Sequence, residues 1–375
     1  MGKLSVATII GTRPEIIRLS EVIKALDQNF EHKLIHTGQN YDYSLNKVFF
    51  EELDLREPDY YLNSVGANLG ETIGNIIARS YDTLEKLNPD ALLVLGDTNS
   101  ALCAIAAKRL KIPVFHMEAG NRCFDENVPE EINRKIVDHI SDINLPYTEH
   151  GRRYLLSEGF RKEHIFVTGS PMKEVLTVNI GKIKESKALE KFNLDSKKYI
   201  LLSAHREENI DIKANFDALM NAINEIADKY NMPVIYSVHP RSRKTINNRG
   251  FVFNGNVKCI EPQGFIDYNR LQIDAYCVLS DSGTLSEESH ILGFPAVLLR
   301  TSTERPEAIE KGPVIIGGIS AIDIEQAIEL AVNLWDREKV NMPIIDYMDT
   351  DVSSKVVRII QSYTKIVNKV IWRKD

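Results

Sequence analysis

Acidic side chains follow two apolar runs in the first half of the chain, at the points where those runs end. Asp97 comes directly after the run 91–96, ALLVLG, and Glu118 ends the run 113–118, PVFHME. Burial at the end of an apolar strand raises the pKa of a carboxyl group, so Glu118 could serve as a general acid or base near neutral pH. The competing interpretation of Asp97 is helix capping, which Asp and Thr commonly provide.

A third carboxylate, Glu130, lies in the stretch PEEINR together with Arg134. Residues spaced i and i+4 share one face of a helix, so these two side chains can meet. An exposed ion pair on a surface helix would explain the same spacing and would contribute little stability. Glu118 and Glu130 bracket a short irregular loop, which we treat as part of the candidate site.

The segment GTRPE, residues 11–15, follows the apolar run 4–10 and opens a helical pattern. Backbone N–H groups at a helix start attract an anion, and Arg13 adds a rigid fork of donors. Pro14 suits the first turn of a helix. The segment is not a GxGxxG nucleotide fingerprint, and a plain helix-start turn is the alternative.

In the second half of the chain, SAHREEN at 203–209 follows the first apolar run. His205 and Arg206 stand together at the end of that run, where they could contact a phosphate or a sugar hydroxyl. A single histidine is often an interior residue, but His205 is flanked by charged side chains. His239 ends the next apolar run, and we expect it to line the wall of the same site.

Small residues at 280–283, SDSG, lie between an apolar run and a helical pattern. Ser282 and Gly283 would let backbone N–H groups approach a diphosphate closely. Glu288 in the following helix is placed for a ribose hydroxyl, as acids are in the nucleotide sites of doubly wound folds. Arg305, in the stretch TERPE, is a second candidate cation for the diphosphate.

These clusters sit at the ends of short β-branched runs that alternate with amphipathic helical patterns. That alternation indicates parallel sheets covered on both faces, in which ligands bind outside the carboxyl ends of the strands. The expected strands of the first half are 4–10, 32–37, 91–96, 113–118, 143–148 and 164–169. A second series starts near Tyr199. We therefore predict an α/β protein of two Rossmann-like domains with a ligand cleft between them.

The length of 375 residues exceeds one compact core and fits two domains. We expect the first domain at 1–172, completed by a C-terminal helix at 353–375 that crosses back to it. The second domain is expected at 173–352, with the polar, Lys-rich segment 179–198 as the crossing between the two. A break in the last helical region is expected at 342–343, where Met is followed by Pro.

Composition and charge argue against several classes of protein. The formal net charge is −7, so nucleic acid is not an expected partner, because phosphate backbones are bound mostly by basic surfaces. No CxxC pair is present, so neither a zinc site nor a disulfide framework is predicted. The apolar run near the N-terminus is too short for a signal peptide or a membrane span. We expect a cytoplasmic protein without membrane insertion.

Taken in order, the motifs resemble those of the non-hydrolysing UDP-N-acetylglucosamine 2-epimerases. They are GTRPE, TGQ, GDT, MEAGNR, PEEINR, HREEN, SVHP, SDSG with a following EE, and TERPE, and they extend from Gly11 to about Gly312. The resemblance implies a GT-B-like, two-domain fold shared with many glycosyltransferases, a homodimer, and no metal or redox cofactor. It also implies inversion at C2 of a UDP-N-acetylhexosamine, through anti elimination of UDP to a 2-acetamidoglucal and re-addition of UDP.

The resemblance also implies roles for individual residues. The acid/base carboxylates correspond to Asp97, Glu118 and Glu130. The family's substrate contacts correspond to Arg13, Arg134 and His205, and its UDP contacts correspond to Ser282, Gly283, Glu288 and Arg305. We count His205 and Arg18 among the candidate catalytic residues as well, and we add Arg206, the neighbour of His205, to the candidate contacts of the substrate. On this assignment the second domain holds UDP and the first domain faces the sugar.

The sequence departs from the family pattern at three places. Arg18 stands where the family usually has a catalytic lysine, so the charge is kept on a planar fork. The family's TGQHRE, which binds a second, activating UDP-GlcNAc in some bacterial members, reads TGQNYD at 37–42. This change weakens the expectation of such regulation. The loop within 118–129 is shorter than usual, carries Cys123 and Phe124, and is expected to touch the sugar.

The TGQNYD form resembles the branch that acts on UDP-6-deoxy-L-hexosamines and yields UDP-N-acetyl-L-fucosamine for capsule or O-antigen. We therefore expect conversion of UDP-2-acetamido-2,6-dideoxy-L-talose, with a UDP-GlcNAc/UDP-ManNAc 2-epimerase as the alternative. Three other classes of protein are alternative interpretations of the same motifs: a glycosyltransferase of the same fold, a hydrolysing epimerase and a non-catalytic nucleotide-sugar binding protein. The group of carboxylates and the lack of an acceptor-binding insertion favour the non-hydrolysing epimerase.

Overall fold

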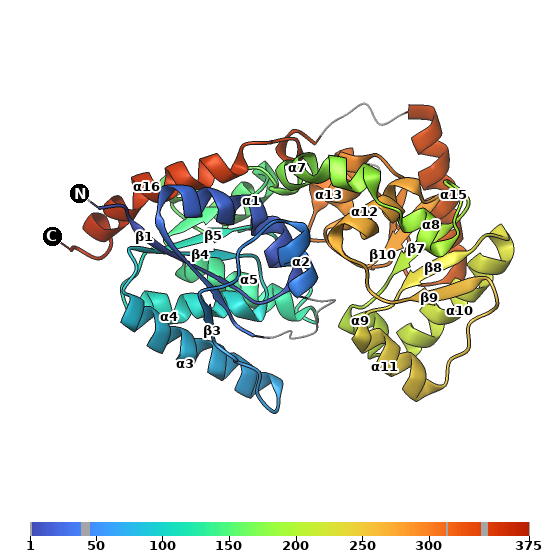
Figure 1. The fold of residues 1–375 in the computed structure, drawn as a ribbon, viewed down its shortest axis with the longest axis horizontal. Coiled ribbons are helices and arrows are strands. Elements are labelled where there is room, and N and C mark those ends of the chain that lie inside the picture. The colour runs from blue at the N-terminus through green and yellow to red at the C-terminus, as the bar shows by residue number, and fades with distance from the viewer. Residues whose placement is uncertain (1, 39–45, 313, 339–343, 375) are drawn as a thin grey trace. The chain divides into compact units, whose positions relative to one another are not determined.

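The protein is described by a computed structural model that covers residues 2–38, 46–312, 314–338 and 344–374. The chain forms two compact units (Figure 1). The N-terminal unit contains residues 1–178 and 346–375, and the C-terminal unit contains residues 179–345. Each unit is built around its own parallel sheet.

The sheet of the N-terminal unit has six parallel strands in the order β3-β2-β1-β4-β5-β6. The strands are β1 (Ser5–Ile10), β2 (Glu31–His36), β3 (Tyr60–Tyr61), β4 (Ala91–Leu95), β5 (Val114–Met117) and β6 (Ile143–Leu145). Their runs of apolar residues are buried because helices cover both faces of a parallel sheet. In the register of β4 and β5, Leu95 pairs with Met117, so the residues that follow both strands leave the sheet at the same edge.

Helices on both faces of this sheet carry several candidate residues. The helical elements are α1 (Arg13–Asn29), α2 (Lys47–Glu52), α3 (Leu69–Leu87), η2 (Asn99–Cys103), α4 (Ala104–Arg109), α5 (Pro129–Ile140), α6 (Glu149–Ser157), η3 (Lys162–His164), α7 (Met172–Glu185), η4 (Ile345–Tyr347) and α16 (Val352–Val370). Helices α1 and α5 both begin with a proline in the first turn, where a missing N–H group costs nothing. Helix α1 starts directly behind β1, whereas α5 starts after the loop that follows β5.

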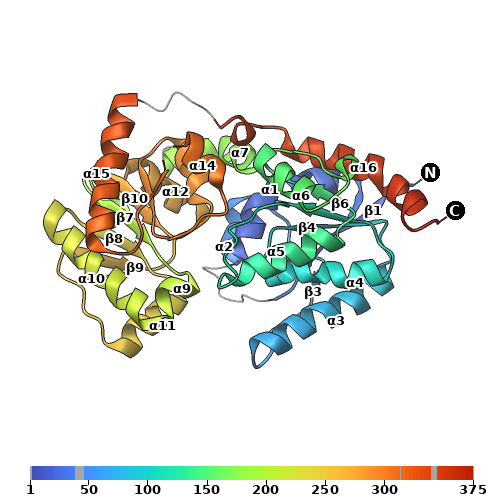
Figure 2. The ribbon, with the colours of Figure 1, turned by 180° about the vertical axis from the view of Figure 1, so that it is seen from behind.

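The last helix, α16, returns to the N-terminal unit and packs along α1, as both ribbon views show (Figure 2). Val356, Ile360 and Val367 on its inner face are fully buried. Its first turn is held by Glu174, whose carboxylate accepts a hydrogen bond of 2.9 Å from the backbone N–H of Ser353. The predicted return of the terminal helix to the first domain is confirmed.

The sheet of the C-terminal unit also has six parallel strands, in the order β12-β11-β10-β7-β8-β9. Its strands are β7 (Ile200–Ser203), β8 (Val234–Ser237), β9 (Val257–Ile260), β10 (Cys277–Ser280), β11 (Ala296–Leu298) and β12 (Val314–Ile316). Its helices are α8 (Ala188–Phe192), α9 (Glu207–Ile210), α10 (Lys213–Tyr230), α11 (Pro240–Arg249), α12 (Phe265–Asp274), α13 (Leu285–Leu292), α14 (Pro306–Lys311) and α15 (Ala321–Glu338). Because Ser280 pairs with Ser203, the SDSG and HREEN turns leave the sheet side by side.

Some expected elements differ from the structure. The segment 164–169 is not a strand and makes only an isolated bridge, Asn144 with Ile165, among the described residues. Its partner strand β6 ends before Pro146, which has no N–H group to continue a ladder. The segment 179–198, expected to be a polar crossing, contains the second part of α7 and all of α8. Gln39 to Asp42 of the TGQNYD stretch and the break at 342–343 lie outside the described residues.

No helix in the described part of the chain is both long and apolar enough to cross a membrane.

The packing of α16 predicts a large stability difference between two isoleucines of that helix. Ile360 is fully buried, whereas Ile366 is 43% exposed. Ile360→Ala should lower the free energy of unfolding by about 2–4 kcal/mol, because a methyl-lined cavity is left behind. Ile366→Ala is the matched control and should change it by less than about 0.5 kcal/mol. Urea unfolding followed by circular dichroism measures both, and equal effects would contradict the observed packing.

Candidate active site

Two turns after β4 and β5 bring carboxylates to one edge of the N-terminal sheet. Gly96 has a φ of +68°, and Glu118 has a φ of +64°, a left-handed conformation that side chains rarely adopt. A Cβ atom added at Gly96 would lie 3.1 Å from Oε2 of Glu118, a tight contact, and the positive φ of Gly96 also favours glycine. A strained non-glycine residue at a strand end is typical of functional sites.

The carboxylate of Glu118 contacts a guanidinium group in a nearly buried ion pair. Nη1 of Arg18, from the second turn of α1, meets Oε2 of Glu118. The side chains are 7% and 11% exposed, respectively. The guanidinium is a charge-assisted partner for a carboxylate that is largely removed from water.

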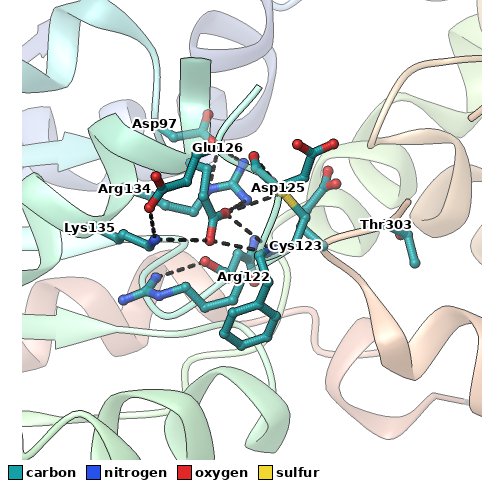
Figure 3. Close-up of polar contacts among 12 residues, drawn as sticks. Asp97, Arg122, Cys123, Asp125, Glu126, Arg134, Lys135 and Thr303 are labelled. Atoms are coloured by element: carbon teal, nitrogen blue, oxygen red, sulfur yellow. Dashed lines mark hydrogen bonds and ion pairs between the residues drawn. The ribbon is translucent and has the colours of Figure 1, made fainter. Parts of the chain in front are cut away.

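Asp97 and Glu131 share a single arginine, Arg134 of α5. Nε and Nη2 of Arg134 lie 3.1 and 2.6 Å from Oδ2 of Asp97. Nη1 of the same guanidinium lies 2.8 Å from Oε2 of Glu131. The pairing of Asp97 with Arg134 can be followed in Figure 3. Charge-assisted contacts through several nitrogens fix both the position and the orientation of Asp97.

Glu131 also holds the loop that carries Cys123 and Phe124. Its carboxylate accepts hydrogen bonds from the backbone N–H groups of Cys123 at 3.1 Å and of Phe124 at 3.3 Å. The thiol of Cys123, labelled in Figure 3, lies 3.3 Å from Oε2 of Glu131. Burial raises the pKa of that thiol, which stays protonated and is a poor nucleophile. The Phe124 ring is 68% exposed and meets Tyr154 edge-on at 5.5 Å.

The GTRPE segment is organised by its own buried acid, Glu15. The carboxylate of Glu15 accepts hydrogen bonds from the backbone N–H groups of Gly11 at 3.0 Å and of Thr12 at 2.8 Å. It also accepts a hydrogen bond from the hydroxyl of Ser100. Burial raises the pKa of Glu15, which these hydrogen bonds oppose. Two N–H groups that were expected to face an anion are thus engaged, and the side chain of Arg13 stays the candidate contact of this segment.

In the C-terminal unit, the HREEN turn is built on the fully buried Asp281. Its Oδ2 atom accepts hydrogen bonds of 2.9 Å from the backbone N–H groups of both His205 and Arg206. Nε of Arg206 donates to the backbone carbonyl of Asp281 at 2.9 Å. The imidazole of His205 has Nδ1 3.4 Å from Oδ1 of Asp281 and stacks on His239 at 5.5 Å. The position of His205 therefore depends on one carboxylate that the SDSG motif supplies.

The SDSG turn itself is compact and leads into α13. The hydroxyls of Ser282 and Thr284 are 2.9 Å apart. A Cβ atom added at Gly283 would lie 2.6 Å from Oε1 of Glu304, so a side chain here would displace that acid. On α13, Glu288 accepts a hydrogen bond of 2.6 Å from the side-chain amide of Gln272 on α12. The turn and its downstream acid are both held in place before a ligand arrives.

Arg305 lies deeper than the sequence suggests. Its side chain is 2% exposed, and its Nη2 atom is 2.7 Å from Oε1 of Glu287 on α13. Glu307 lies 4.0 Å from the same guanidinium. Arg206, in contrast, is 17% exposed, and Glu304 is 3.8 Å from its Nη2 atom. A direct contact of Arg305 with UDP stays a prediction, since its observed partners are acidic side chains of the same unit.

The structure thus brings the sequence-predicted residues together in two groups. In the N-terminal unit, Arg18 meets Glu118 and Arg134 meets Asp97, while Glu130 lies in the first turn of α5. Sequence reasoning missed Glu131 and Asp138. Both lie on the face of α5 that carries Arg134, three residues before it and four residues after it. That helical spacing was the available signal.

Within the residues that the structure describes, no cluster of three or more His, Cys, Asp and Glu side chains could hold a metal ion.

Sequence comparisons identify relatives along nearly the whole chain. A family model described as UDP-N-acetylglucosamine 2-epimerase matches residues 24–361. A UDP-N-acetylglucosamine 2-epimerase of Methanocaldococcus jannaschii is 39% identical over 340 residues, which cover 88% of this chain and 92% of the relative.

Solved structures agree with this match. The UDP-N-acetylglucosamine 2-epimerase from Rickettsia bellii superposes with a TM-score of 0.91 at 44% identity, and 99% of this chain and 100% of that chain are covered. The Methanocaldococcus jannaschii UDP-GlcNAc 2-epimerase in complex with UDP-GlcNAc and UDP gives 0.90 at 36% identity, with 96% and 100% covered.

A glycotransferase of kitacinnamycin shares the fold alone, with a TM-score of 0.60 at 10% identity and coverage of 96% of this chain and 99% of that chain. The predicted GT-B-like fold class is confirmed by this likeness and by the two parallel sheets. The predicted family is confirmed by the model match and by the relatives. The chain belongs to the UDP-N-acetylglucosamine 2-epimerase family.

Proposed function

We propose that this UDP-sugar 2-epimerase inverts C2 of a UDP-N-acetylhexosamine by anti elimination of UDP and re-addition of UDP. The proton on C2 is not acidic in the bound sugar, because no carbonyl group is adjacent to C2. As the bond from C1 to UDP breaks, C1 becomes electron-poor and the C2 proton becomes removable. This elimination gives a 2-acetamidoglucal intermediate. A proton then returns to C2 on the opposite face, and UDP adds again at C1.

The observation that carries this proposal is the set of carboxylates fixed at one sheet edge. Glu118 is held against Arg18, and Asp97 is held by Arg134, so their oxygens are already oriented. Glu130 supplies a third carboxylate in the first turn of α5. Inversion requires proton transfer at both faces of C2, and two or more positioned carboxyl groups meet that requirement.

The C-terminal unit is proposed to hold the leaving group. The backbone of the turn at Ser282 and Gly283 would accept the diphosphate, and Glu288 would bind a ribose hydroxyl. His205 and Arg206 lie beside that turn and would stabilise the charge that develops on the departing UDP. The preorganisation by Asp281 supports this role, because groups fixed in advance need not reorganise during the reaction.

For the sugar, we propose UDP-2-acetamido-2,6-dideoxy-L-talose, which would give UDP-N-acetyl-L-fucosamine. The support is the Cys123–Phe124 loop, where Glu131 fixes the backbone and the apolar Phe124 ring stays exposed. An apolar ring suits a C6 methyl group better than a C6 hydroxyl. The competing substrate pair is UDP-GlcNAc and UDP-ManNAc, which the family description and the UDP-GlcNAc complex of the Methanocaldococcus jannaschii relative favour.

We further propose that the chain acts as a homodimer, as the family resemblance implies. Apolar side chains are exposed on β3, on α3 and on the segment between them. They are Tyr60, Tyr61, Val65, Leu69 and Tyr81. Exposed apolar and aromatic side chains grouped on neighbouring elements are typical of protein–protein contacts, and a second copy of the chain is the occupant that we propose.

Glu118→Gln tests the acid/base assignment. The variant should epimerise about 100- to 10,000-fold more slowly, because the amide cannot exchange a proton, while the affinity for UDP changes little. Turnover in heavy water should place deuterium at C2 of the product of the parent enzyme, as read by proton NMR. Glu149→Gln, at a side chain that is 50% exposed on α6, is the control and should leave turnover unchanged. Product formed by the parent without solvent deuterium would contradict the elimination.

Sugar selectivity tests the proposed substrate. Purified protein is given UDP-GlcNAc and the 6-deoxy-L-talosamine nucleotide in separate reactions, and C2 inversion is followed by NMR. The kcat/KM for the 6-deoxy sugar should exceed that for UDP-GlcNAc. The ratio should correspond to about 1–3 kcal/mol, which is the usual effect of a small apolar difference in a pocket. Phe124→Ala should reduce that preference. Equal or better turnover of UDP-GlcNAc would assign the protein to the alternative substrate.

Association of the chain can be tested by sedimentation. The purified protein should sediment as a dimer, and Leu69→Asp on α3 should weaken association, because it places a charge on the proposed contact. Leu69 is 61% exposed, and Ile322 of the C-terminal unit, 69% exposed, offers a matched control. Ile322→Asp should leave the dimer intact. A monomeric parent protein would contradict the proposal.

A further inference from the structure

A fully buried aspartate on α5, Asp138, lies behind the carboxylates of the N-terminal unit and has no role in the mechanism above. Its Oδ2 atom accepts a hydrogen bond of 3.1 Å from the backbone N–H of Gly120. The same atom lies 2.7 Å from Nη1 of Arg122, and Oδ1 lies 2.9 Å from Nδ1 of His116. Burial alone would raise the pKa of Asp138, but His116 and Arg122 hold it below its usual range. Asp138 is therefore an ionised group with three nitrogen atoms in contact with it.

One branch of this network reaches Glu118. Gly120 stands two residues after Glu118, and the backbone N–H of Glu118 itself donates to the carbonyl of Leu145 at 3.1 Å. Glu118 is thus fixed on one side by β6 and on the other by Asp138. The left-handed backbone of Glu118 is costly for a side chain with a Cβ atom, so it persists only where neighbouring contacts hold it.

The second branch reaches the strand end that carries Asp97. The imidazole of His116, which is fully buried, donates from Nε2 to the backbone carbonyl of Gly96 at 2.8 Å. Gly96 directly precedes Asp97. Asp138 therefore orients His116, and His116 fixes the turn from which Asp97 projects.

The third branch ties the network to the body of the unit. Nε and Nη2 of Arg122 form a bidentate pair with Glu158, at 2.8 and 2.7 Å, where α6 ends. Arg122 also donates to the backbone carbonyl of Asn121 at 2.7 Å. The loop that begins after Gly120 is therefore anchored on two elements at once.

From this arrangement we infer that Asp138 is a positioning residue for C2 epimerisation, acting through the two turns that carry Glu118 and Asp97. It touches neither substrate nor UDP. Its effect is to fix where two proton-transferring carboxylates stand relative to each other. This inference rests on the acid/base roles proposed above for those two residues.

The test compares Asp138→Asn with a matched control on the same element. Asp142, just beyond the end of α5, is also buried and also binds a backbone N–H and a cation, Val114 at 2.9 Å and Lys108 at 2.5 Å. Val114 lies at the start of β5, the end of the strand away from Glu118, and Lys108 lies on α4. Asp142→Asn therefore removes a similar buried charge without touching the turns of the site.

Asp138→Asn should lower kcat about 10- to 100-fold, since small misplacements of reacting groups have effects of that size. KM and the Kd for UDP, measured by calorimetry, should stay within about twofold of the parent, because the proposed UDP site lies in the C-terminal unit. Asp142→Asn should leave kcat within about twofold even if it lowers the melting temperature equally. Equal kcat for the two variants would overturn the inference.

Two further variants keep the inference testable if Asp138→Asn does not fold. His116→Gln should lower kcat about tenfold through the Gly96 branch alone, with an unchanged Kd for UDP. In an Asp97→Asn background, His116→Gln should slow the residual C2 exchange less than in the parent, because residues that act through one group are not additive. Full additivity would overturn the inference. Unimpaired exchange in Glu118→Gln itself would instead refute the proposed acid/base role.

Discussion

Hydrogen bonds from strand-end loops to buried carboxylates hold the candidate site in both units. Glu15 binds the N–H groups of Gly11 and Thr12, and Asp281 binds those of His205 and Arg206. Glu131 and Asp138 bind the loop after β5 in the same way. A buried carboxylate without partners is very unfavourable, so each loop must form for its acid to be buried. The loops are therefore ordered by the fold rather than by the ligand.

This constraint explains how the strained parts of the site persist. Glu118 and Phe124 both have positive φ angles, at +64° and +56°. Such conformations cost about 1–3 kcal/mol each for residues with side chains, and surrounding contacts must offset that cost. Glu131 binds the N–H of Phe124, and Asp138 binds the N–H two residues after Glu118. The two acids that fix these strained positions, Glu131 and Asp138, thus belong to the same helix, α5.

Apart from the two-residue edge strand β3, the sequence was sufficient for the strands of the two sheets and for the strand ends on which the candidate residues lie, because buried parallel strands leave a clear apolar pattern. It failed at 164–169, where an apolar run next to Pro146 forms only a bridge. It also missed Asp138, since a lone acid in a polar-faced helix looks like a solvated residue. The burial of Arg305 could not be predicted either, because its pairing with Glu287 on α13 depends on tertiary packing.

The exchange of the family's lysine for Arg18 separates two roles at the reacting carbon. A lysine ammonium can lose its proton when buried, so it could take part in proton transfer, whereas a guanidinium stays charged under all conditions in proteins. Arg18 is nearly buried against Glu118, so it supplies a fixed positive charge and cannot exchange a proton. In the proposed mechanism, proton movement at C2 then falls to the carboxylates alone. On that proposal, the geometry of Glu118 and Asp97, rather than the identity of the nearby cation, determines which face of the sugar each one serves.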